Sequence, residues 1–85
     1  MKLKIFANEE DFENDYLQEV IGRVADEGYE VENYDLDAEA THTLAEIYDI
    51  YTSPSLVVAG DDGRVIEVWR GSIPTSSDVI NFMNT

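Results

Sequence analysis

The most informative stretch of the sequence runs from Leu44 to Gly71 and reads LAEIYDIYTSPSLVVAGDDGRVIEVWRG. Ser53-Pro54-Ser55 interrupts the chain, and the apolar run at residues 56–59 that follows is typical of a buried strand. Glycine and aspartate fill residues 60–63, a strong turn signal because glycine readily adopts positive φ. Residues 64–70 then return as a second strand. The stretch therefore predicts a β-hairpin.

Alternation along the return strand places Ile66 and Val68 on one side and Val65 and Trp69 on the other. Trp69 is interpreted as a packing residue of the core or of an edge strand. The same strand ends at Gly71, which separates it from the last helix.

The N-terminal part of the chain predicts a strand followed by one long helix. Residues 3–7 form a short, mostly apolar run, and Asn8 after it is a good N-cap. The acids at residues 9–11 place negative charge on the first helical turn, where the helix dipole favours it. One apolar stripe then predicts a helix of about 18 residues that ends at Gly28. The stripe consists of Phe12, Tyr16, Leu17, Val20, Ile21 and Val24.

The next segments predict a strand and two further helices. Residues 29–32 alternate as a strand, but the apolar phase slips afterwards, which indicates a bulge or a strand end near Asn33. A second helix is expected from an N-cap at Asp37 to Asp49, with Ala40, Leu44, Ile47 and Tyr48 as its apolar stripe. A final helix follows Thr75, whose hydroxyl is an expected cap.

The order of the elements, β-α-β-α-β-β-α, restricts the topology. A helical crossover joins the first two strands, which are therefore expected to be parallel, whereas the last two form a tight antiparallel hairpin. The fold class is thus α/β: a four-stranded mixed sheet with helices on both faces, in a single domain covering residues 1–85.

This arrangement resembles the thioredoxin superfamily over nearly the whole chain. The resemblance is most specific from Leu44 to Gly71, where a helix ending Leu-Ala-x-x-Tyr is followed by a proline, a hydrophobic strand, a glycine turn and a strand closed by glycine. It implies strand order 2-1-3-4, with the third strand antiparallel to the rest. It also implies that Pro54 is the family's structural cis-proline and that backbone groups of Ser53 pair with an extended peptide or thiol ligand.

The sequence departs from the family at the active site, because it contains no cysteine. The alignment sets Asp11-Phe12-Glu13-Asn14 on the family's Cys-x-x-Cys motif, and thiol exchange requires a thiolate that none of these residues supplies. We expect no catalytic residue, cofactor or metal. The candidate partner-binding residues are Asp11, Phe12, Glu13, Asn14, Ser53, Pro54, Gly71 and Ser72.

Charge is the other unusual property of the chain. Nineteen acids and five bases give a net charge of −14, and residues 1–50 hold fifteen of the acids. Such a charge disfavours nucleic acids and anionic membranes as partners. It is explained either by a solvated surface, including one adapted to high salt, or by a face that docks a basic partner. No apolar run is long enough for a signal peptide or a membrane span, so a cytoplasmic monomer is expected.

The favoured hypothesis is a redox-inactive protein- or peptide-binding module. The alternatives are a glutathione-type thiol-ligand protein or enzyme without cysteine, and an acidic DNA mimic or regulatory protein. The acids at residues 9–13 could also hold a cation, but stabilisation of the helix start explains them without a ligand. His42 is interpreted as a polar surface residue.

Overall fold

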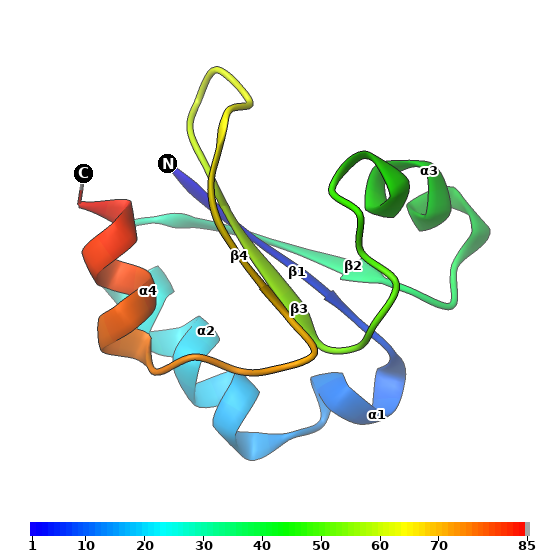
Figure 1. The fold of residues 1–85 in the computed structure, drawn as a ribbon. Coiled ribbons are helices and arrows are strands. Elements are labelled where there is room, and N and C mark those ends of the chain that lie inside the picture. Colours follow the sequence, from blue (N-terminus) through cyan, green and yellow to red (C-terminus); the bar gives the residue numbers. More distant parts are fainter. Residues whose placement is uncertain (85) are drawn as a thin grey trace.

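A computed structural model describes residues 1–84 and contains four strands and four helices within them (Figure 1). In chain order they are β1 (Lys2–Ala7), α1 (Glu9–Phe12), α2 (Asp15–Asp26), β2 (Glu30–Asp35), α3 (Glu39–Ile47), β3 (Ser55–Ala59), β4 (Val65–Arg70) and α4 (Ser76–Met83). The strands form one sheet in the order β2-β1-β3-β4. β1 and β2 are parallel, and β3 is antiparallel to both β1 and β4. The predicted fold class and strand order are confirmed.

Helices cover both faces of the sheet, and each face has its own hydrophobic cluster. α2 and α4 lie side by side on one face, whereas α3 lies on the other (Figure 1). The first cluster joins apolar residues of β1 and β3 to Leu17, Val20 and Val24 of α2 and to Val79 and Met83 of α4. The second joins Phe6, Val57 and Ala59 of the sheet to Ala45 and Ile50. β1 and β3 are therefore buried from both sides, which explains their nearly continuous apolar sequences.

The prediction of one long helix after β1 is wrong, because the structure has two helices there. α1 ends at Phe12, and α2 begins at Asp15 with Asn14 as its N-cap. The side chain of Asn14 accepts the backbone N–H groups of Tyr16 (2.8 Å) and Leu17 (3.2 Å). Asparagine is a favourable N-cap because its side-chain oxygen accepts hydrogen bonds from backbone N–H groups of the first turn, which would otherwise have no partner in the helix. Tyr16, which was expected in the buried stripe, lies in the first turn of α2 and is 42% exposed.

Two details of the strands also differ from expectation. The pairing of β2 with β1 is continuous from Glu30 to Asp35, so there is no bulge or strand end near Asn33. The phase slip arises because Val31 packs against one cluster and Tyr34 against the other, on opposite faces. A register shift occurs instead in the hairpin, where Val58 and Ala59 of β3 pair with Glu67 and Val65 of β4.

That shift leaves Ile66 as an extra residue of β4. The prediction that Ile66 and Val68 share one side of this strand is therefore wrong. Ile66 packs with Trp69 against the cluster under α2 and α4, and Val68 packs against the cluster under α3. Trp69 contacts Phe82 edge to face, with ring centroids 5.7 Å apart, which confirms its interpretation as a packing residue.

α3 lies rotated relative to the predicted helix. Its N-cap is Ala38 rather than Asp37, and it makes no side-chain capping bond. Thr41 and Ala45 form its buried side, while Ile47 is 69% exposed. Asp49 ends the helix region in the left-handed conformation, with φ of 55°. The guanidinium of Arg70 then donates to the carbonyls of Tyr48 (2.9 Å) and Asp49 (3.0 Å), which ties this helix end to β4.

The remaining predicted helix boundaries agree with the structure. Gly28 follows α2 with φ of 88°, and the side chain of Thr75 caps α4 by accepting the N–H of Asp78. β4 is an edge strand, and the N–H of Val68 within it donates to the carboxylate of the neighbouring Glu67 (2.8 Å). No helix within residues 1–84 has the length and apolar character needed to cross a membrane.

Candidate functional site

The loop before Pro54 is attached to the start of α1 by a small hydrogen-bond network. The Oγ of Ser53 accepts the backbone N–H of Asn8 (2.9 Å) and donates to Oδ2 of Asp11 (2.5 Å). Asn8 in turn accepts the N–H of Asp11 through its Oδ1 (2.8 Å), as the predicted N-cap. Asp11 and Ser53, forty-two positions apart in the sequence, are therefore in direct contact. Since all three side chains are partly buried, the network fixes the position of both segments.

The other candidate residues around α1 have mainly structural positions. Phe12 is half-buried and packs against the cluster under α2 and α4. Glu13 forms the C-cap of α1, and its side chain is exposed. Asn14 is exposed and caps α2. The four-residue segment aligned with the family's catalytic motif is thus the junction between two helices.

Pro54 and Gly71 form a second contact close to Ser53. The Ser53–Pro54 peptide bond is cis, and the N–H of Gly71 donates to the carbonyl of Pro54 (2.9 Å). Gly71 has φ of 75°, a conformation that side-chain-bearing residues rarely adopt. Ser72, which follows it, is exposed. The structure therefore joins the candidate residues in two pairs, Asp11 with Ser53 and Pro54 with Gly71.

Beside Ser53 lies a hollow of about 400 Å³ that the sequence patterns did not reveal. It lies between the end of β1, the loop that leads into α3, and the segment after α3. Its apolar lining consists of Leu36, Ala45, Ile50 and Tyr51, and its polar lining of Asn8, Asp37, His42, Glu46 and Ser53. We call it the apolar hollow after the buried Ala45 and Ile50 in its lining, although five of its nine lining residues are polar. His42 is exposed, and its Nε2 lies 3.2 Å from the carbonyl oxygen of Leu36.

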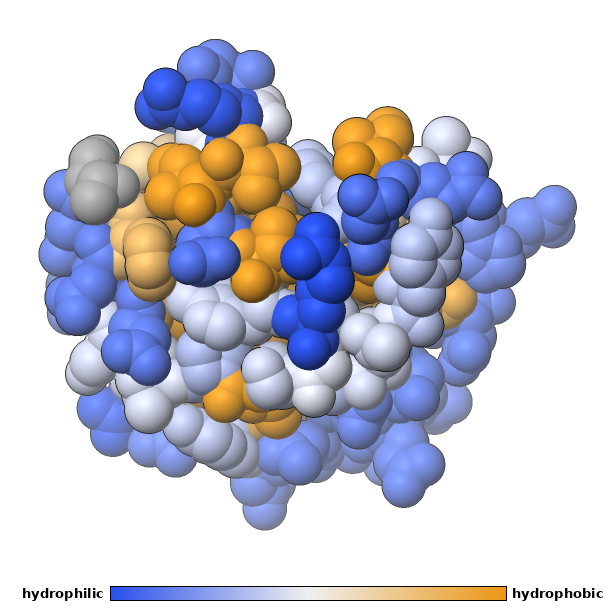
Figure 2. Space-filling view, viewed as in Figure 1, coloured by the Kyte–Doolittle hydropathy of each residue, from blue (hydrophilic) through white to orange (hydrophobic). Residues whose placement is uncertain are grey.

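A second hollow of about 370 Å³ adjoins the first, because Asn8 and Asp37 line both. Its other lining residues are Glu9, Glu10 and Glu13 of the α1 region. We call it the acidic hollow. The side of the molecule formed by α1 and α2 is mainly hydrophilic, whereas exposed hydrophobic atoms gather near the β3–β4 hairpin (Figure 2). Neither hollow is lined by a lysine or an arginine.

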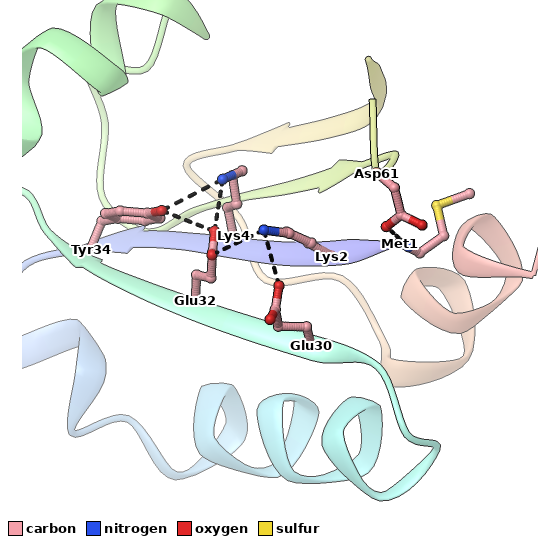
Figure 3. A network of polar contacts seen from close by, with 7 residues as sticks. All are labelled: Met1, Lys2, Lys4, Glu30, Glu32, Tyr34 and Asp61. Carbon is pink, nitrogen blue, oxygen red and sulfur yellow. Dashed lines mark hydrogen bonds and ion pairs between the residues drawn. The ribbon is translucent and has the colours of Figure 1, made fainter. Parts of the chain in front are cut away.

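Two of the cations lie instead on β1, paired with acids of β2. Lys2 contacts Glu30 (3.1 Å) and Glu32 (3.4 Å), and Lys4 contacts Glu32 (2.7 Å), on the sheet face opposite α2 (Figure 3). The Tyr34 hydroxyl also donates to Glu32 (2.9 Å). The hydrogen bonds from Lys4 and Tyr34 lower the pKa of Glu32 from its ordinary 4.5 to about 2. The pKa of Lys4 is raised, because Glu32 and Tyr34 outweigh the opposing effect of burial.

The arginines also lie away from the hollows. Arg70 binds the last carbonyls of the α3 region, and Arg23 pairs with Glu19 across one turn of α2 (3.0 Å). Arg64 is exposed in the turn that leads into β4. The negative charge of the carboxylates that line the two hollows is therefore not balanced by any lysine or arginine in the same lining.

One kind of chemistry can be excluded for this region. The chain has no cysteine, so thiol–disulfide exchange by its own residues is excluded. The Ser53 hydroxyl donates a hydrogen bond to the Asp11 carboxylate, and this contact holds Ser53 in place at the edge of the apolar hollow. Among residues 1–84, no group of three or more His, Asp or Glu side chains is arranged to hold a metal ion.

Comparison with known proteins supports the fold and goes no further. No protein-family model matches the chain, and no curated protein matches it. Among solved structures, thioredoxin 1 from the thermophilic eubacterium Thermosipho africanus TCF52B is 16% identical, with a TM-score of 0.71 over 99% of this chain and 91% of that one. A thioredoxin from Thermus thermophilus is 18% identical, with a TM-score of 0.59 over 98% of this chain and 71% of that one. The chain therefore has a thioredoxin-like fold and none of the cysteines of a thiol–disulfide oxidoreductase.

Proposed function

We propose that this chain is a redox-inactive binding module that recognises an extended segment of a protein partner beside Ser53 and Pro54. The observation that carries the proposal is the pair of adjoining hollows, which share Asn8 and Asp37 and extend from α3 to α1. Ligand-binding sites are typically concave and combine apolar lining residues with a few fixed polar groups, and the first hollow contains both kinds of residue.

The backbone around Ser53 suits an extended ligand. Within residues 1–84, the hydrogen bonds of Ser53 run through its hydroxyl, and none engages its backbone N–H or carbonyl. These two groups are free to pair with a peptide backbone, as in the addition of a strand. The contacts from Asn8 and Asp11 hold the Ser53 side chain in place, so binding would not have to order it.

Charge distinguishes this proposal from glutathione binding. Glutathione is an anion, and the lining of both hollows carries carboxylates without lysine or arginine. Coulomb repulsion would oppose its approach. A peptide with neutral or basic character faces no such penalty. We further propose that the module works as a monomer in the cytoplasm. A chain without cysteine needs no disulfide, so the reducing conditions there do not affect its stability.

Selection from a displayed library of random seven-residue peptides tests the proposed function. Selected peptides are synthesised, and their binding is mapped by amide chemical-shift changes in the labelled protein. We expect the changes to centre on residues 8–13, 36–37 and 51–54. Their absence from all three segments for every peptide that binds would refute the proposal. Ser53→Pro removes the backbone N–H and is expected to weaken binding. It also removes the hydroxyl that bonds Asn8 and Asp11, so Ser53→Ala, which removes the hydroxyl alone, is the control. Only the loss of affinity beyond that of Ser53→Ala is assigned to the backbone N–H.

A further inference from the structure

We infer that the two hollows together select a particular peptide chemistry: a large apolar side chain placed next to arginine or lysine. The apolar side chain would occupy the apolar hollow, and the cation would lie over the acidic hollow. This inference rests on the proposed function and adds to it the class of ligand.

The apolar hollow has a fixed floor and an exposed rim. Ala45 and Ile50 line it and belong to the cluster under α3, where they are 5% and 2% exposed. Their positions are set by close packing against the sheet, so the floor exists before a ligand binds. Tyr51 also lines the hollow and is 75% exposed, which is unusual for so large a side chain. An apolar ligand group placed there would bury part of this ring.

The acidic hollow supplies the complementary charge. Glu9, Glu10, Glu13 and Asp37 line it, and its boundary with the apolar hollow is shared through Asn8 and Asp37. Neighbouring positions of one extended peptide can therefore reach both hollows. Because its lining contains no lysine or arginine, the acidic hollow is negatively charged and is complementary to a positively charged ligand.

Other occupants fit these observations less well. A metal ion would need several ligands in a compact set, and residues 1–84 contain no such set. A second copy of this chain carries the same net charge of −14 and would be repelled. Nucleic acid is excluded for the same electrostatic reason. A segment that is both basic and apolar satisfies both hollows at once.

Four short peptides test the inference directly. The probe is acetyl-Gly-Leu-Arg-Arg-Gly-amide, and the other three replace leucine by alanine, both arginines by glutamine, or all three residues. Binding is measured by amide shift titration at low salt. We expect the glutamine peptide to bind about 5- to 10-fold more weakly, since exposed ion pairs contribute modestly. The alanine peptide should also bind about 10-fold more weakly, because less apolar surface is buried.

Matched variants separate the two halves of the site. Glu13→Gln with Asp37→Asn should weaken the arginine peptide about 3- to 10-fold and leave the glutamine peptide unchanged. Asp26→Asn with Glu27→Gln removes the same charge from the exposed end of α2 and should change either affinity less than about 2-fold. Tyr51→Ala should reduce the preference for leucine over alanine, whereas Ile47→Ala, an exposed residue outside both hollows, should not.

The outcomes distinguish this inference from the proposed function. Equal binding of all four peptides at the Ser53 surface would overturn the selectivity and leave the binding function intact. Shifts confined to residues 71–73 would overturn the selectivity, and they would overturn the proposed function too if the library peptides gave the same result. No binding of any of the four at 5 mM would overturn the inference, and the library selection would then decide independently whether the chain binds peptides at all.

Discussion

The carboxylate of Glu32 should stabilise the fold more than any other surface acid on the β1–β2 pair. Its pKa falls from 4.5 to about 2, because Lys4 and Tyr34 donate hydrogen bonds to it and Lys2 adds a weaker one. A shift of that size corresponds to about 3 kcal/mol at most, since one pKa unit is worth about 1.4 kcal/mol. The side chain is 29% exposed, so water screens part of the interaction. We expect Glu32→Gln to cost about 1–2 kcal/mol of unfolding free energy at pH 7.

Glu30 provides a matched control on the same strand. It contacts Lys2 at 3.1 Å, but its side chain is 59% exposed, and surface pairs of this kind contribute at most about 1 kcal/mol. Glu30→Gln should therefore cost no more than about 0.5 kcal/mol. Both variants remove one negative charge from a chain of net charge −14, so general relief of repulsion is the same in each. Their difference isolates the hydrogen-bond network around Glu32.

The effect of Glu32 should depend on pH in a defined direction. A carboxylate whose pKa is lowered on folding stabilises the folded state above its unfolded pKa, and the contribution is lost as pH falls through the folded pKa. The difference between the two variants should thus be full near pH 7 and shrink between about pH 4.5 and 2. Urea unfolding followed by Trp69 fluorescence measures it. Equal losses in both variants, or a difference that does not change with pH, would refute this reasoning.

Three further predictions concern local stability, each measured by urea unfolding. Gly71→Ala should cost about 1–2 kcal/mol, because the φ of 75° is strained for alanine, while the new Cβ would make only an ordinary contact with Oγ1 of Thr52 at 3.5 Å. Gly22→Ala, in an open position of α2, should instead add about 0.5–1 kcal/mol of stability, and the same sign for both variants would contradict this. Asn14→Ala removes the cap of α2 and should cost about 1 kcal/mol, and an unchanged midpoint would show that the helix break has another cause. Leu56→Ala should cost about 2–5 kcal/mol because the side chain is fully buried, and a loss under 1 kcal/mol would mean that the core collapses around it.

The parts of the fold that local chemistry determines could be predicted from the sequence. The hairpin was predictable because residues 60–63 offer glycine and aspartate between two apolar runs, and the strand order followed from the resemblance. The break at Asn14 was not, because the apolar stripe continues through it without a change of period. The extra residue Ile66 was hidden for a related reason: β4 has apolar residues at both parities, so alternation alone cannot fix its register.

The candidate site was only partly accessible to sequence reasoning. The contact between Asp11 and Ser53 joins two residues that the alignment had singled out, and it depends on their positions in three dimensions. The hollows depend on how separate loops pack, and Leu36 and Ile50 carry no pattern that distinguishes a cavity lining from ordinary core. The signals that pointed toward the acidic hollow were the excess of acids in residues 1–50 and the run of acids at residues 9–13, three of which line it.

The edge strand β4 has a consequence for behaviour at high concentration. Free sheet edges are templates on which other chains can add strands and polymerise. In β4 the N–H of Val68 already donates to the carboxylate of Glu67. An incoming strand would have to displace this carboxylate from the N–H, and the negative charge would then lie beside the backbone of the incoming strand. The opposite edge, β2, carries Glu30, Glu32 and Asp35. Glu30 and Glu32 are paired with the lysines of β1, so Asp35 contributes most of the repulsion toward a like-charged neighbour. We therefore expect both borders of the sheet to oppose the addition of a strand from another copy.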